Sequence, residues 1–195
     1  EHFLYGNDDM YFNKPVTPDT FFAKDLLPII RFNRRPFRKW YLLFKTKVVG
    51  KQLGNYLQTI HNAALLVEKK YGTYYSGKTH HNIDAYLKSN YEHTRQVFDK
   101  EISATLTNHV RSMNDIQRNI YSYVPLAEKR AHMQYVTQRT SFRFHIDNRK
   151  LYRKFEKYNP MLFCMNDSQF ANDDDRKCAI DFLAKLFPDK SQFEK

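Results

Sequence analysis

The chain has 195 residues, enough for one sizeable hydrophobic core or two small ones, and its two cysteines are too few for a disulfide framework, which favours a reduced, cytosolic setting. No stretch approaches about eighteen uninterrupted apolar residues and no charged-then-apolar leader is present, so the sequence supports neither a membrane span nor a signal peptide. The formal net charge of +11 is compatible with nucleic acid, an anionic membrane or a phosphorylated substrate as partner, and the charge alone does not distinguish between them.

The first predicted element is an apolar run from Phe3 to Phe12 that is interrupted by Asn7, Asp8 and Asp9. The run indicates a buried strand that ends in carboxylates, as in a parallel sheet whose carboxyl edge binds ligands. The alternative is an Asx-type turn between two strands. These side chains supply the oxygen ligands that Mg²⁺ prefers. Because the chain begins almost inside this element, we expect that an N-terminal portion is missing.

The segment from Arg31 to Lys51 is the most basic part of the chain. It lies within residues 26–67, which include no acidic residue, and its basic side chains alternate with aromatic ones. Such a segment could follow a nucleic-acid backbone, lie on a membrane surface or hold a sugar-phosphate polymer. A solvated amphipathic face is the simplest alternative.

The middle of the chain is predicted to be helical. Apolar residues at three-to-four spacing indicate an amphipathic helix between Gly50 and Gly72, and Gly72 is a suitable stop. A loop is expected at 71–78. Two further helices are expected at 85–106 and from Asn114 towards His132, the last one kinked or split by Pro125.

The C-terminal part alternates strands and helices. The expected elements are a half-buried strand at 140–146, a helix at 149–158, a buried strand at 161–165 and a helix that Asn172 caps and Pro188 ends. The buried strand runs into Asn166 and Asp167, as the first run does into Asn7 to Asp9. Two strands with Asn-Asp tips could bring those tips together at one edge of one sheet.

These motifs resemble the Stealth proteins, which include bacterial capsular-polysaccharide hexose-1-phosphate transferases and the animal lysosomal-enzyme N-acetylglucosamine-1-phosphotransferase. The similarity covers residues 3–16 (second conserved region), 81–89 with 110–116 (third region), and 163–167 with 187–194 (fourth region). The usual H-x-P start of the third region reads His81-Asn82-Ile83 here, and the first region has no counterpart. The resemblance implies one truncated catalytic domain over 1–195, with conserved regions within 1–25, 77–120 and 140–195. Its expected fold is mostly helical α/β with a small, partly parallel sheet, a Rossmann-like core that lacks its N-terminal strands.

The resemblance also implies a reaction and its residues. A sugar-1-phosphate would pass from a UDP-sugar to a hydroxyl of a growing glycan, with release of UMP and with Mg²⁺ or Mn²⁺ as cofactor. The implied catalytic residues are Asp8, Asp9, Arg111 and, as general base, His81. The implied substrate-binding residues are Asn7, Lys88, Arg111 and Asp115. The implied metal ligands are Asp8, Asp9, Asn166 and Asp167.

Several alternatives stay open. His80 rivals His81 as the base, and His93 is less favoured. Asp115 either orients Arg111 or His81 or caps a helix. A metal-dependent glycosyltransferase that releases UDP and a nucleic-acid-binding module are rival functions, although no nucleic-acid partner is expected. We expect a cytoplasmic protein, peripheral at the inner face of the membrane and in contact with capsule-synthesis machinery.

Overall fold

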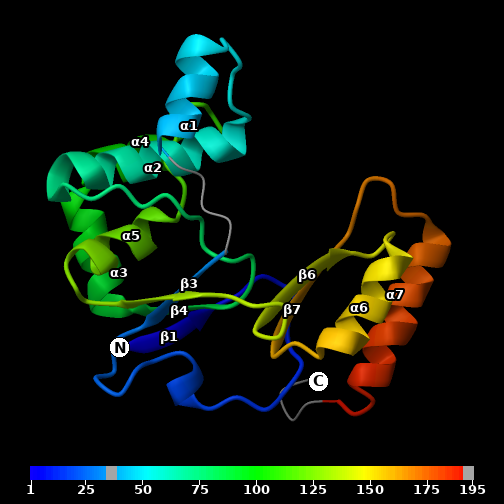
Figure 1. The fold of residues 1–195 in the computed structure, drawn as a ribbon. Helices are drawn as coiled ribbons and strands as arrows, with labels where there is room; N and C mark the ends of the chain where they lie inside the picture. Colours follow the sequence, from blue (N-terminus) through cyan, green and yellow to red (C-terminus); the bar gives the residue numbers. More distant parts are fainter. Residues whose placement is uncertain (34–38, 191–195) are drawn as a thin grey trace. The chain divides into compact units, whose positions relative to one another are not determined.

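The computed structural model describes residues 1–33 and 39–190. These residues form two compact units, each assembled from segments that are separated in the sequence. The first unit contains residues 1–5, 17–80 and 84–136, and the second contains residues 6–16, 81–83 and the chain from 137 onwards. Both combine helices with small, partly parallel sheets, which confirms the predicted α/β class (Figure 1). Within the described residues the strands form three small sheets rather than the single sheet that we expected.

The first unit contains two sheets of two strands each. β1 (His2–Tyr5) pairs antiparallel with β4 (Asp84–Leu87), and β3 (Ile29–Phe32) pairs in parallel with β5 (His132–Tyr135). Its helical segments are η1 (Pro18–Thr20), α1 (Lys39–Leu43), the π-helical η2 (Phe44–Val48), α2 (Asn55–Tyr71), α3 (Lys88–Val97), α4 (Asp99–Leu106) and α5 (Ile120–Ala127).

The core of the first unit is built on α2 and α5, as the amphipathic pattern of α2 predicted. Ala63, Ala64 and Val67 of α2 are fully buried in one cluster with Tyr123 of α5. Small side chains let two helices approach closely, so the alanines suit this contact. Gly72 ends α2 with a positive φ of 75°, which confirms the predicted stop.

Two helix predictions in this unit are wrong. The expected helix at 85–106 begins only at Lys88, because residues 84–87 pair as a strand with β1, and it breaks again at Phe98 between α3 and α4. The expected helix from Asn114 to His132 is reduced to α5. Pro125 cannot donate a helical hydrogen bond, and the helix ends two residues later. In the first segment long-range strand pairing overrides the local helical preference, and in the second residues 113–119 form turns and irregular backbone before α5 begins.

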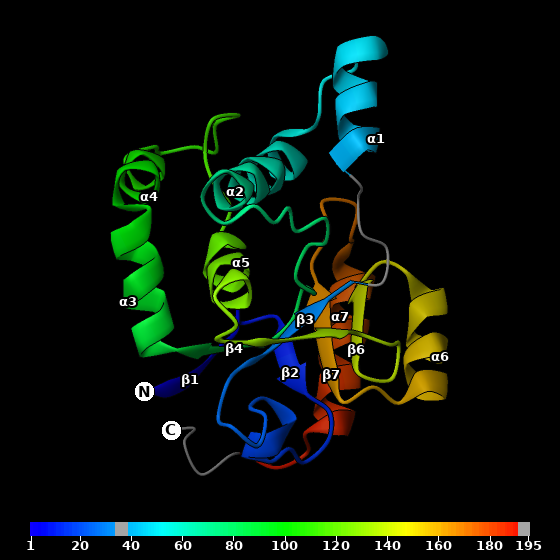
Figure 2. The same ribbon diagram turned by 60° about the vertical axis from the view of Figure 1, so that its left-hand side comes forward.

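The second unit contains one sheet of three strands in the order β2-β7-β6. Central β7 (Leu162–Asn166) pairs antiparallel with β2 (Met10–Phe12) and in parallel with β6 (Ser141–His145). α6 (Arg149–Tyr158) connects β6 to β7, and α7 (Asp173–Leu186) follows β7 (Figure 2). All four C-terminal elements were predicted within a residue or two. The parallel pair with its connecting helix is one β-α-β unit, the repeating element of a Rossmann-like core.

Aromatic side chains fill the core of the second unit. Phe144 of β6 and Phe163 of β7 contact Phe155 of α6 and Phe182 of α7 with ring centroids 4.9–6.5 Å apart. Asn172 caps α7: it accepts a hydrogen bond from the Asp175 N–H at 2.9 Å. The acids at the start of α7 therefore cap the helix, as predicted.

The opening segment differs from its prediction. It is not one buried strand: β1 is exposed along its whole length, and the chain turns at Gly6 to Asp9 before β2 begins. The two strands belong to different sheets. The turn alternative is therefore closer to the structure than the buried strand, and Gly6, Asn7, Asp8 and Asp9 are all residue types that favour turns.

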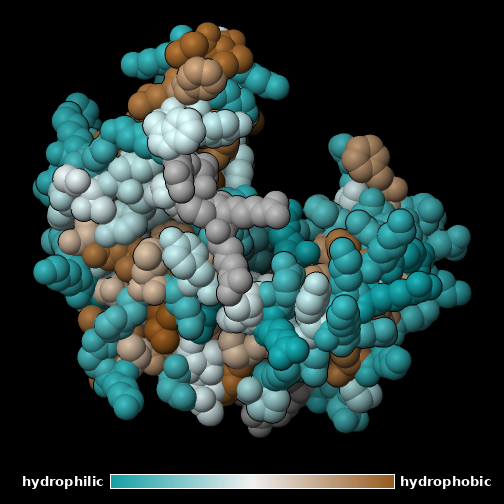
Figure 3. All heavy atoms as spheres, in the orientation of Figure 1, coloured by the Kyte–Doolittle hydropathy of each residue, from teal (hydrophilic) through white to brown (hydrophobic). Residues whose placement is uncertain are grey.

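The α1–η2 segment carries an exposed apolar surface (Figure 3). Trp40, Tyr41 and Phe44 are each at least half exposed, and Lys45 and Lys47 are interspersed with them. Part of the basic segment predicted from the sequence, residues 34–38, lies outside the described residues, as do residues 191–194 of the fourth conserved region. Within the described part of the chain, no helix combines the length and the apolar content needed to cross a bilayer.

Candidate active site

Asp9 lies at the edge of the second unit's sheet where β2 begins and β7 ends. Because β2 runs antiparallel to β7, Met10 pairs with Cys164, and the Met165 N–H donates to the Asp9 C=O at 2.9 Å. The half-buried carboxylate of Asp9 accepts hydrogen bonds from Nδ2 of Asn166 and, at 3.3 Å, from Sγ of Cys164. The antiparallel pairing thus brings one residue of each Asn-Asp motif together.

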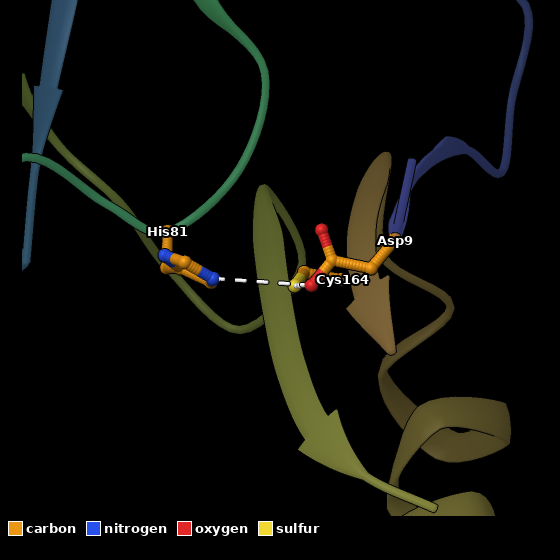
Figure 4. Close-up of side chains that lie close together, drawn as sticks. All are labelled: Asp9, His81 and Cys164. Atoms are coloured by element: carbon orange, nitrogen blue, oxygen red, sulfur yellow. Dashed lines mark hydrogen bonds and ion pairs between the residues drawn. The ribbon is translucent and has the colours of Figure 1, made fainter. Parts of the chain in front are cut away.

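His81 approaches the same carboxylate from a loop. Its Nε2 lies 4.0 Å from Oδ2 of Asp9, and one ligand atom each of His81, Asp9 and Cys164 lie within 4.8 Å of one another (Figure 4). The loop is held by the buried side chain of Asn82, which donates to Oγ of Ser141 at the start of β6 at 3.2 Å. We call the group of Asp9, His81, Cys164 and Asn166 the Asp9 centre.

The hydrogen bonds of Asn166 fix the orientation of its side chain. Its Oδ1 accepts from Nε of Arg143 at 2.7 Å, so its amide nitrogen faces Asp9. The second carboxylate oxygen of Asp9, Oδ1, is buried and has no hydrogen-bond partner within the described residues. A buried carboxylate oxygen without a donor is costly, so this atom is suited to bind a cation or a ligand donor.

Cys164 acts as a neutral donor in the Asp9 centre. Burial, and secondly the neighbouring Asp9, raise the pKa of the Cys164 thiol to about 12. The thiol is therefore protonated at neutral pH and donates to the carboxylate. A metal ion that bound this thiol would have to displace its proton, since metals bind the thiolate.

Carboxylate and amide oxygens such as those of Asp9 and Asn166 are the type of ligand that Mg²⁺ or Mn²⁺ prefers. The mixed oxygen, nitrogen and sulfur atoms of Asp9, His81 and Cys164 would suit Zn²⁺ by type, with the thiol losing its proton on binding. Mg²⁺ is commonly held by one or two carboxylates together with substrate phosphates. Asp9 supplies one carboxylate, and its Oδ1 has no hydrogen-bond partner within the described residues.

The other residues of the two Asn-Asp motifs lie around this centre in different roles. Asn7 and Asp8 belong to the exposed turn before β2. Asp167 is exposed, and its Oδ2 lies 3.5 Å from Nε of Arg176 on α7. Within the described residues, Asp9 is the acid of these motifs whose carboxylate lies within 4.0 Å of an imidazole nitrogen.

Arg111 and Asp115 belong to the first unit, where they line a cavity of about 270 Å³. The guanidinium of Arg111 lies 5.2 Å from the ring centre of Tyr56. Asp115 is buried and accepts hydrogen bonds from the Ser112 N–H at 2.7 Å and from Asn108 at 2.6 Å. Asp115 therefore stabilises its own loop, and it does not cap a helix, because α5 begins five residues later.

The remaining candidates of the first unit have structural contacts. His80 is 2% exposed and its Nε2 lies 3.2 Å from the carboxylate of Asp84. His93 contacts Glu128 at 2.9 Å. Lys88 begins α3 and forms an exposed ion pair one turn further along it. Of the three candidate bases, His81 is the one in the Asp9 centre.

Sequence reasoning missed two contributors to this site, Cys164 and Arg143. Alternation along a strand puts residues two apart on the same face, so Cys164 and Asn166 share a face of β7. That signal was available in the sequence. The contact of Arg143 with Asn166 depends on the register of β6 against β7, which the sequence does not reveal.

This α/β chain matches curated proteins over most of its length. It is 29% identical over 182 residues to a capsular polysaccharide phosphotransferase of Haemophilus influenzae, covering 88% of this chain and 48% of that protein. It is 26% identical to a capsular polysaccharide phosphotransferase of Neisseria meningitidis serogroup A, covering all of this chain and 36% of that protein. An exopolysaccharide phosphotransferase of Nocardia farcinica is 28% identical, with all of this chain and 38% of that protein covered.

These relatives confirm the resemblance to the Stealth proteins that the sequence motifs predicted. The chain is similar to capsular and exopolysaccharide phosphotransferases over most of its length. No family model matches the chain. It spans about half or less of the length of these relatives.

Proposed function

We propose that this chain carries the reaction centre of a phosphotransferase that moves a sugar-1-phosphate from a UDP-sugar to a hydroxyl of a growing glycan and releases UMP. Relatives named capsular or exopolysaccharide phosphotransferase support the phosphotransferase class. The observation that carries the proposal is the meeting of Asp9, His81 and Asn166 at one edge of the sheet. The carboxylate can bind a cation that neutralises a phosphate, and the imidazole can accept a proton.

His81 is the proposed general base. Its Nε2 takes the proton of the acceptor hydroxyl, whose oxygen then attacks the phosphorus next to the sugar, and the bond from that phosphorus to the bridging oxygen breaks so that UMP leaves. The carboxylate of Asp9, 4.0 Å away, stabilises the imidazolium that forms. Asn166 and Cys164 hold Asp9 in position through their hydrogen bonds.

The proposed cofactor is Mg²⁺ or Mn²⁺. Asp9 would hold it, with Asp8, Asn166 and Asp167 as further candidates, and the ion would neutralise charge on the diphosphate. In the present arrangement the oxygen of Asn166 is engaged by Arg143, so Asn166 orients Asp9 instead. Arg111 and Lys88 are proposed to bind substrate phosphates, and Asn7 and Asp115 to support the substrate-binding loops.

The α1–η2 segment is proposed to contact the inner face of an anionic membrane. Lys45 and Lys47 complement negative headgroups, and the exposed rings of Trp40, Tyr41 and Phe44 suit the interfacial region. An anionic polysaccharide is the alternative partner, because it would be attracted by the same charges.

Product analysis tests the proposed reaction. A UDP-hexose, MgCl₂ and a glycan acceptor are incubated with the protein in its full natural length, and the products are followed by ³¹P NMR. The proposal predicts UMP together with a new phosphodiester signal. Release of UDP without a phosphodiester would contradict it and favour a glycosyltransferase.

The variants Asp9→Asn and Asp8→Asn form a matched pair in the same assay. Removing the charge at Asp9 is expected to lower kcat by about 100-fold or more, because it removes electrostatic stabilisation of the transferring phosphoryl group. Asp8→Asn, at the exposed neighbouring residue, is expected to lower kcat less. Circular dichroism checks that both variants fold. Equal rates for Asp9→Asn and the parent protein would exclude the Asp9 centre from the reaction.

A further inference from the structure

The first unit contains an aromatic cavity that the proposed reaction does not use. It has a volume of about 170 Å³, and its lining consists of five aromatic residues and one arginine: Phe3, Tyr5, Tyr86, Tyr91, Tyr121 and Arg118. Drug-sized ligands occupy pockets of about 300–1,000 Å³, so this cavity suits a single ring rather than a nucleotide.

The walls of the cavity are aromatic ring pairs that are open to solvent on one side. Phe3 stacks on Tyr86 with centroids 5.7 Å apart, and Tyr91 stacks on Tyr121 with centroids 4.2 Å apart. Phe3 and Tyr91 are 38% and 39% exposed. Large aromatic side chains are normally buried, so such a cluster at a hollow marks a binding surface.

Arg118 supplies a polar group with unused hydrogen-bonding capacity. Its Nη2 lies 3.0 Å from Oδ2 of Asp84, and its guanidinium carbon lies 4.9 Å from the ring centre of Tyr5. Its other terminal nitrogen, Nη1, is buried and has no hydrogen-bond partner within the described residues. Buried donors nearly always have a hydrogen-bond acceptor in proteins, so we take this nitrogen without one as a sign that a ligand supplies the acceptor.

The charge balance indicates what that acceptor is. Asp84 neutralises Arg118, and His80 contacts the same carboxylate at 3.2 Å. A paired guanidinium gains less from a phosphate than a free one does, and it can still donate to a neutral hydroxyl. A hexose ring matches both features, because its C–H face packs on the negative face of an aromatic ring while its hydroxyls accept hydrogen bonds.

We infer that the aromatic cavity binds one hexose ring of the glycan acceptor. The choice of the acceptor as the source of the ring rests on the proposed function. The binding itself is measured without turnover, so a failure of this inference and a failure of the phosphotransfer reaction are distinguishable. A UDP-hexose is the other source of the same ring, and the test separates the two.

The test uses saturation-transfer-difference NMR on the protein with methyl β-glucopyranoside, methyl 2-acetamido-glucopyranoside, a UDP-hexose and uridine as separate probes. Tyr91→Ala removes one wall, and Tyr91→Phe restores the ring. Tyr135→Ala is the matched control, because Tyr135 is a similarly exposed tyrosine of the same unit outside the cavity. Substitutions of Arg118 are avoided, because they would leave the buried Asp84 without its cation.

The expected result is saturation transfer to the ring C–H protons of a methyl hexoside. Tyr91→Ala should weaken this binding by about five-fold, and Tyr91→Phe and Tyr135→Ala should retain it. Absence of transfer to both hexosides, or equal weakening by Tyr135→Ala, would overturn the inference. Stronger binding of uridine would make the cavity a nucleobase site and overturn it too. If Tyr91→Ala weakened the binding of the UDP-hexose alone, the assignment of the bound ring to the acceptor would be overturned.

Discussion

At the residue scale, two adjacent histidines have opposite environments. His80 is buried against Asp84, and His81 faces Asp9. His81→Gln is therefore expected to lower kcat by about 100-fold or more with little change in stability, because it removes the base. His80→Gln is expected to lower the free energy of unfolding by about 1–3 kcal/mol, because it disturbs a buried charged contact.

Urea denaturation and initial rates, measured on both variants, check this prediction. The assignment of His81 as the base fails if the two variants show the reverse pattern, with His80→Gln inactive but stable and His81→Gln active. From the sequence we favoured His81 over its rival His80 as the base, but the residue pattern does not reveal which imidazole faces which carboxylate.

Cys164 provides a second prediction at this scale. It is fully buried with a pKa raised to about 12 by burial, whereas Cys178 on α7 is partly exposed. Iodoacetamide at pH 8 should therefore alkylate Cys178 and leave Cys164 unmodified in the folded protein, because the thiolate is the reactive form. Peptide mass spectrometry reads out both sites. Preferential alkylation of Cys164 would show it to be a thiolate and contradict this prediction.

At the element scale, the elements that were predicted correctly are those whose sequence pattern lies within a single segment. β6, α6, β7 and α7 follow from residue alternation, helical spacing and capping within single segments. β4 could not be predicted in this way, because its four residues are compatible with a helix and become a strand only by pairing with β1. The same holds for β5 with β3.

Gly72 gives a prediction for one helix end. Its φ of 75° lies in the left-handed region, which residues with a Cβ rarely adopt, so Gly72→Ala should lower the free energy of unfolding by about 1 kcal/mol. Gly54, before the first residue of α2, has a φ of −64° and no close neighbours, so Gly54→Ala is a matched control with a smaller effect. Equal destabilisation in urea would show that the end of α2 does not depend on this conformation.

At the scale of the whole molecule, the sequence predicted the fold class and the meeting of two Asn-Asp motifs, but for a partly wrong reason. We expected two strand ends at one edge of one sheet. The structure instead joins the start of β2 to the end of β7 through an antiparallel pairing, so Asp9 meets Asn166 while Asp8 and Asp167 are exposed. The division into two compact units could not be predicted from local sequence patterns, because each unit is assembled from separated segments.

The net charge of +11 leads to a prediction about the surface of the α1–η2 segment. Flotation with vesicles that contain phosphatidylglycerol should recover the protein, and vesicles of phosphatidylcholine alone should recover less. Lys45→Glu combined with Lys47→Glu should reduce the recovery on anionic vesicles. The double variant Lys69→Glu and Lys70→Glu, at the end of α2, controls for net charge. Equal loss in both double variants would show that binding depends only on total charge.

The account depends most on Asp9 and His81 facing the same cation-bound phosphate. The direct measurement is Mn²⁺-induced broadening of histidine side-chain signals in the presence of UDP, with the His81 signal assigned by its loss in His81→Gln. The account predicts that substoichiometric Mn²⁺ broadens the His81 imidazole signal in the parent protein and that Asp9→Asn abolishes the effect. An unbroadened His81 signal, or broadening that persists in Asp9→Asn, would contradict it.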